Sequence, residues 1–107
     1  MKIAKQAAVV GIGSTPYYRR GESHPQTFNE MICKAIIAAC DDSGLSVKDI
    51  DGFSYYSSGT DTPLLMESLG IPEVRYSSMV TSGGGGSVGA VQNAAMAVAT
   101  GAANVVV

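Results

Sequence analysis

The sequence predicts an α/β fold in which strands and helices alternate in the order β-α-β-α-β-α-β. Apolar runs rich in valine and isoleucine alternate with segments whose apolar residues recur at helical spacing. Four glycines, residues 83–86, join an extended segment to an alanine-rich helical one, and no charged residue follows Arg75. This pattern favours a mostly parallel sheet around a central helix that is buried on more than one face.

The first half of the chain supplies two expected strands and one helix. Residues 3–12 form a short apolar run that predicts a buried first strand. Thr27 and Glu30 have the spacing of a capping box, and Gly44 suits the end of the helix that follows. Residues 50–57 predict a second strand whose two adjacent tyrosines point to opposite faces, one packing inside and one reaching a pocket rim.

The second half repeats this alternation. Pro63 fits the first turn of a short helix that ends at Gly70. Residues 74–81 predict a third strand, residues 87–100 a helix, and residues 104–107 the start of a fourth strand. Because a buried strand is a poor terminus, we expect residues 1–107 to form the opening part of a longer domain.

Composition excludes several classes of function. The chain has 107 residues, enough for one small domain, with 46% hydrophobic and 15% charged residues, so it can bury a core. A net charge of −2 disfavours nucleic-acid binding, which needs a basic face. No apolar run reaches the roughly 18 residues of a membrane helix, and no secretory signal is recognisable, so we expect a cytoplasmic location.

The cysteines and the histidine give no catalytic or metal pattern. Cys33 and Cys40 are seven residues apart on one expected helix, about 10 Å at ~1.5 Å per residue, which is too far for a disulfide. We expect both to pack in the core. His24 is the only histidine and is expected in an exposed loop, and no cluster has metal-ligand spacing, so no metal is predicted.

The glycine-rich stretch is the best candidate site. Glycine has no Cβ, so a ligand can approach the backbone closely there. The first amides of the following helix would point at such a ligand. The predicted binding residues are Gly83, Gly84, Gly85, Gly86 and Ser87.

Other interpretations of this stretch remain open. Gly84, Gly86 and Gly89 satisfy a dinucleotide fingerprint, although consecutive glycines match many such patterns by accident. Ser87 satisfies the G-x-S-x-G nucleophile elbow, which would make the protein a hydrolase or acyltransferase, but it needs a histidine base. Ser87 could instead cap the helix. Residues 19–20, two arginines, could meet a phosphate at the mouth of the site.

The same residues resemble a known family, the thiolase superfamily. Residues 84–91, GGGSVGAV, followed by residues 94–107, AAMAVATGAANVVV, resemble its nucleophile turn, central helix and next strand. Residues 8–16, AVVGIGSTP, resemble its first strand and turn, and residues 35–45 and 49–52 are also similar. The similarity covers nearly the whole chain but only about the first quarter of such a protein.

The resemblance implies a particular branch of that superfamily. Gly84 stands where the family has its nucleophilic cysteine, and a glycine cannot carry an acyl group. This departure resembles thiolase-like lipid-transfer proteins and steroid side-chain aldolases, which cleave carbon–carbon bonds of acyl-CoA thioesters by retro-aldol chemistry. The family implies a coenzyme A thioester as substrate and no bound cofactor.

The resemblance also implies partners. Members often work with a small zinc-ribbon/OB-fold protein, and the family's homodimer would pair residues 74–80 as edge strands across a two-fold axis. The main hypothesis is therefore a thiolase-like lyase or acyltransferase of lipid metabolism. The alternatives are a non-catalytic subunit that binds acyl-CoA or lipid, and an enzyme that uses Ser87.

Overall fold

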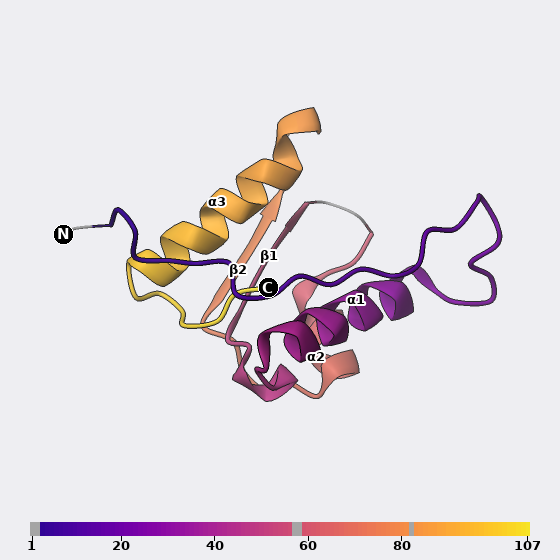
Figure 1. Ribbon diagram of the computed structural model, residues 1–107, viewed down its shortest axis with the longest axis horizontal. Helices are drawn as coiled ribbons and strands as arrows, with labels where there is room; N and C mark the ends of the chain where they lie inside the picture. The colour runs from indigo at the N-terminus through magenta and orange to yellow at the C-terminus, as the bar shows by residue number, and fades with distance from the viewer. Residues whose placement is uncertain (1–2, 57–58, 82) are drawn as a thin grey trace.

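A small parallel sheet lies between two helical layers in the computed structural model, which describes residues 3–56, 59–81 and 83–107 (Figure 1). Helix α3 covers one face of the sheet, and α1 and α2 lie on the other side. The mixed α/β class predicted from the sequence is confirmed. The elements are α1 (Phe28–Ser43), the 3-10 turn η1 (Val47–Asp49), β1 (Gly52–Tyr56), α2 (Thr62–Leu69), β2 (Tyr76–Val80), the 3-10 turn η2 (Gly83–Gly85) and α3 (Gly86–Ala99).

The strands run parallel, as expected. β1 pairs with β2 from Gly52 opposite Tyr76 to Tyr56 opposite Val80. On its other edge β1 meets the end of the chain through a parallel bridge between Gly52 and Val106. The Ser54 amide donates to the Val107 carbonyl at 2.9 Å. The fourth expected strand is therefore present only as this bridge, and Ser57, the last residue of the second expected strand, lies outside the described residues.

Successive side chains of β1 point to opposite layers, as a strand's period of two requires. Phe53 is 1% exposed and joins Ile36 and Leu65 in the core beneath the sheet. The Ser54 hydroxyl donates to the Ala90 carbonyl of α3 at 2.6 Å on the opposite face. The alternation continues to the end of the strand, and it decides where the tyrosines of β1 lie.

The helix ends follow the capping residues in the sequence. The Thr27 hydroxyl accepts from the Glu30 amide at 3.0 Å, and Gly44 ends α1 in the left-handed region with φ of 80°. Asp61 caps α2 by accepting from the Leu64 amide at 2.9 Å, and Gly70 ends that helix at φ of 72°. These predicted boundaries are confirmed to within a residue or two.

The expected first strand is absent, which corrects the prediction for residues 3–12. This segment has no strand partner among the described residues: its first part borders the groove along α3, and only from Gly11 onwards does it lie along α1. A Cβ on Gly11 would come within 2.6 Å of the Ala39 carbonyl oxygen, and one on Gly13 would overlap the same turn of α1. The Ile12 amide donates to the Asp42 carboxylate at 2.9 Å. Apolar composition predicted burial in a sheet, whereas the two glycines allow close contact with a helix.

The expected burial of the central helix is also only partly correct. Small residues of α3, Gly86, Ala90 and Ala97, are buried against the rest of the fold. On the other side, Val88 is 73% and Val91 is 60% exposed. One sheet can cover only one face of a helix, so the remaining apolar face stays open in these 107 residues.

Candidate functional site

The glycine turn lies at the carboxyl edge of the parallel sheet. β2 ends at Val80, the chain turns through Gly83–Gly85, and α3 begins at Gly86. The carboxyl end of β1, at Tyr56, lies beside the start of this helix. Ligands of parallel α/β folds commonly bind at this edge. Residue 82, part of the predicted glycine-rich stretch, lies outside the described residues.

The turn exposes fewer backbone amides than the sequence suggested. The Gly83 amide donates to the Thr81 carbonyl at 3.1 Å, so it is already paired within the turn. A 3-10 turn pairs amides with carbonyls three residues earlier, and η2 continues directly into α3. The amides of Gly86 and Ser87 are consequently directed along the helix. Gly84 remains the best placed to meet a ligand, because it is exposed and no atom lies within 4 Å of a Cβ built on it, whereas the 3-10 turn over Gly83–Gly85 already uses the Gly85 amide.

Ser87 does not cap α3, which corrects one of the two interpretations of this residue. The N-cap is Gly85, and it has no side-chain hydrogen bond. Ser87 is the second residue of the helix and is exposed. His24, the base that a serine nucleophile would need, is exposed in the loop before α1 and lines neither groove described below. Nothing in the described residues supports Ser87 as a nucleophile.

Two grooves meet beside the first turn of α3, at Ser87, and the glycines of residues 83–86 line neither of them. The larger, of about 860 Å³, runs along the open face of α3 between the N-terminal segment and the end of the chain. The smaller, of about 370 Å³, enters the layer of α1 and α2. Both are mainly apolar, and five residues line both: Ser54, Tyr55, Tyr56, Ser87 and Val107.

Tyr56 is the residue whose position the sequence left undecided. Its ring packs against Gly86, and a Cβ on that glycine would overlap ring atoms Cδ2 and Cε2. The neighbouring Tyr55 points to the other layer, where its hydroxyl is 3.1 Å from that of Thr62. The expected division of roles between the two tyrosines is therefore present. The signal in the sequence was a tyrosine at the end of β1 and a glycine at the start of α3, 30 residues later, but only the fold brings them together.

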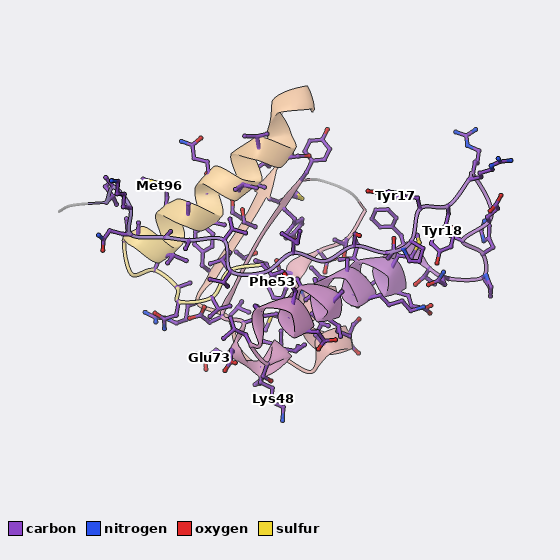
Figure 2. The ribbon with its side chains drawn as sticks, in the orientation of Figure 1. Tyr17, Tyr18, Lys48, Phe53, Glu73 and Met96 are labelled. Carbon is purple, nitrogen blue, oxygen red and sulfur yellow. The ribbon has the colours of Figure 1, made fainter. Side chains whose placement is uncertain are left out.

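The arginine pair is not part of this site. Residues 14–26 form a loop that extends beyond the start of α1, away from α3, and it carries Tyr17 and Tyr18 (Figures 1 and 2). Residues 19–20 belong to this loop and line neither groove. The suggested phosphate contact at the mouth of the site is not supported by this arrangement.

The cysteines have the properties expected of packing residues. Cys40 is buried and Cys33 half-buried, and both are free thiols. Burial raises the pKa of each thiol, so both stay protonated and poorly nucleophilic at neutral pH. Within the described residues there is no group of three or more His, Cys, Asp or Glu side chains that could hold a metal ion. No helix in the described part of the chain has the length and apolar character needed to cross a membrane.

Comparison with known proteins gives a consistent set of relatives. No protein-family model matches the chain. It is 42% identical over 103 residues to a steroid side-chain-cleaving aldolase of Thermomonospora curvata, a match covering 94% of this chain and 25% of the relative. It is 39% identical over 107 residues to a 17-hydroxy-3-oxo-4-pregnene-20-carboxyl-CoA lyase of Mycobacterium tuberculosis, covering 98% of this chain and 27% of the relative.

A solved structure agrees with these matches. It is described as an Ltp2-ChsH2(DUF35) aldolase and superposes with a TM-score of 0.84 at 37% identity, over 92% of this chain and 25% of its own. The chain is similar to aldolases. It spans about a quarter of the length of the relatives it matches. None of them is named a thiolase, so the thiolase-like part of the prediction remains a proposal.

Proposed function

We propose that the chain is the N-terminal part of a thiolase-like lyase that cleaves a carbon–carbon bond of an acyl-CoA thioester by a retro-aldol reaction. The observation that carries the proposal is the exposed glycine turn at the carboxyl edge of the sheet, which leads directly to Ser87 at the rim of an apolar groove. The similarity to two proteins named aldolase and lyase supports the same chemistry. No residue here takes the place of the family's cysteine at Gly84, and none is needed for a retro-aldol step.

The substrate named for one relative suits this reaction. In 17-hydroxy-3-oxo-4-pregnene-20-carboxyl-CoA, carbon 20 is bonded to carbon 17, so the hydroxyl group is β to the thioester carbonyl. A base removes the hydroxyl proton, the C–O bond becomes a carbonyl, and the bond between the α and β carbons breaks. Its electron pair moves onto the thioester as an enolate, and a proton returns to the α carbon. We assign neither the acid nor the base among these 107 residues.

The role proposed for this chain is to stabilise the enolate oxygen. Backbone amides aimed at a developing negative charge are an effective way to lower the barrier, because they need no reorganisation. Gly84 is an exposed residue at the start of the helical segment, where the helix dipole also favours negative charge near its amide. This assignment requires no side chain, which agrees with the missing cysteine.

The decisive experiment removes one amide. Gly84→Pro deletes the N–H donor, and proline is tolerated in the first turn of a helix. In the full-length protein with a β-hydroxyacyl-CoA substrate, we expect kcat to fall by about 10²–10³, the usual effect of removing one oxyanion donor. The matched control is Gly84→Ala, which keeps the amide and has open space for its Cβ. It should retain kcat within a few-fold.

Other outcomes would contradict the proposal. Equal loss of activity in both variants would mean that the shape of the turn matters rather than its amide. Binding of acyl-CoA without any cleavage would favour the non-catalytic subunit instead. Stable acylation of the native protein would place a nucleophile elsewhere and end the assignment of Gly84 to the cysteine position.

The proposal also includes a protein partner. The similar solved structure carries a name that joins two components, Ltp2 and ChsH2(DUF35). We propose that the full-length protein likewise works with a second chain, and the resemblance suggests a small zinc-ribbon/OB-fold protein. Two measurements test this proposal. The two chains should co-purify from a host that expresses both genes, and the lyase activity should be compared in the presence and absence of the second chain.

A further inference from the structure

The ring of Tyr56 stands where the two grooves meet. Tyr56 is the last residue of β1 and is half-buried. It lines the groove along α3 and also the smaller pocket between the sheet and α1. Tyr56 is one of the five residues that border both spaces, and its ring packs directly against Gly86, the first residue of α3.

The fold fixes the direction of this ring. Ser54 and Tyr56 are two residues apart on one strand, so they share a face. Ser54 meets α3 at Ala90 through its 2.6 Å hydrogen bond, and Tyr56 meets α3 at Gly86, one helical turn earlier. Only a residue without a Cβ leaves room for the ring at that position. The pairing of Tyr56 with Gly86 thus holds the ring across the junction of the grooves.

The pocket behind the ring is strongly apolar. Its inner residues come from three elements of the core, and Phe53 lies between α1 and the strands (Figure 2). Apart from the five shared residues, its lining is Ile32, Ile36, Phe53, Thr60 and Leu65. The Tyr55 hydroxyl is engaged with Thr62 at 3.1 Å, and Thr62 with Ser77 at 2.5 Å, so these hydroxyls are already paired. Such a lining suits hydrocarbon rather than a polar group.

We propose that Tyr56 is a specificity-determining residue whose ring closes the smaller pocket and so limits the size of the apolar acyl group held beside the glycine turn. The inference rests on the proposed function, because it takes the ligand to be the acyl part of a coenzyme A thioester. It concerns the aromatic ring and not the hydroxyl. Replacing the ring by a small side chain would join the pocket to the groove.

The test compares affinities for a short and a long thioester. In the full-length protein, Tyr56→Ala should raise the affinity for dodecanoyl-CoA relative to butanoyl-CoA, by about fourfold for each additional methylene group that becomes buried. A shift of tenfold or more in the ratio of the two dissociation constants, measured by isothermal titration calorimetry, is expected. Tyr56→Phe is the matched control: it keeps the ring and should leave the ratio unchanged. Tyr56→Leu, which keeps more apolar bulk, should give an intermediate shift and serves if the alanine variant does not fold.

A second pair of variants tests the contact with Gly86. Gly86→Ala places a Cβ against the ring, so it should weaken binding of both thioesters. Combining it with Tyr56→Ala removes the overlap and should restore binding with the preference of Tyr56→Ala. Failure of the double variant to recover would contradict the role of this contact.

The outcomes separate this inference from the proposed function. An unchanged ratio in folded Tyr56→Ala would overturn the inference alone, because a general structural defect would weaken both thioesters alike. A native protein that binds neither thioester would overturn the proposed function, and the inference with it.

Discussion

Asp51, just before β1, forms hydrogen bonds with two other segments of the chain. Its carboxylate accepts from the Asn104 amide at 3.0 Å and from the Val105 amide at 2.8 Å. Its carbonyl accepts from the Arg75 amide at 2.7 Å, just before β2. Hydrogen bonds to a charged group are stronger than neutral ones, so this side chain holds the end of the chain beside β1.

The first stability prediction follows from this contact. Asp51→Asn keeps one acceptor oxygen but replaces the other by an NH₂ group, which cannot accept from the backbone amides of Asn104 and Val105. The free energy of unfolding should therefore fall by about 1–3 kcal/mol. The control is Asp41→Asn, which removes a carboxylate from the exposed surface of α1 and should change stability by less than about 0.5 kcal/mol. Urea unfolding of both variants measures the difference. Equal urea midpoints for the two variants would show that the Asp51 hydrogen bonds make no net contribution to stability.

At the scale of elements, small residues decide which segments approach one another. α3 lies close to the sheet because glycine and alanine occupy its inner face, and the Asn93 amide group donates to the Ser78 hydroxyl of β2 at 3.0 Å. The N-terminal segment lies close to α1 for the same reason, through Gly11 and Gly13. Close packing of backbone on backbone leaves no tolerance for an added methyl group.

Gly13→Ala is expected to separate the N-terminal segment from α1. Its Cβ would overlap backbone atoms of Ala35 and Ala39, and overpacking of this kind costs about 1–3 kcal/mol. Gly85→Ala is the matched control, because its Cβ has open space and alanine restricts the unfolded chain. Thermal unfolding should show a lower midpoint only for Gly13→Ala. Faster amide exchange at Ile12 would place the defect in this segment, and unchanged exchange there would contradict the explanation.

At the scale of the whole molecule, the described residues leave one strand edge and one helix face without cover. β1 is the only strand that pairs with β2 among these residues, so the far edge of β2 is free. Val88, Val91 and Met96 of α3 are exposed. An unpaired edge favours association with another strand, and an isologous pair of such edges gives a two-fold dimer.

We expect a homodimer that pairs β2 with its symmetry mate, as the family resemblance implies. Met79 lies on this strand and is 52% exposed, so Met79→Lys should weaken the dimer, because a charged side chain on an edge strand opposes pairing. Met96→Lys, at a site 43% exposed on α3, is the control and should leave the dimer intact. Sedimentation velocity over a range of protein concentrations distinguishes them. If only Met96→Lys dissociated the dimer, the interface would lie on α3 and not on β2.

Local features of the fold could be predicted from the order of residues alone. Thr27 at one helix start, Pro63 in the first turn of another, and helix-ending glycines such as Gly44 act within one helical turn, so their pattern was sufficient to place these helices. The glycine turn before α3 was equally clear. The apolar and aromatic residues of segments 50–57 and 74–81 also placed β1 and β2, which lie inside these bounds.

Tertiary structure alone decided the features that depend on a distant partner. Whether residues 3–12 pair as a strand or lie on α1 depends on what is available beside them, and their composition suits both. The packing of the Tyr56 ring over Gly86 also arises only when β1 and α3 come together. Residues close together in the sequence determine where helices and strands form. Contacts between those helices and strands determine which side chains face the site.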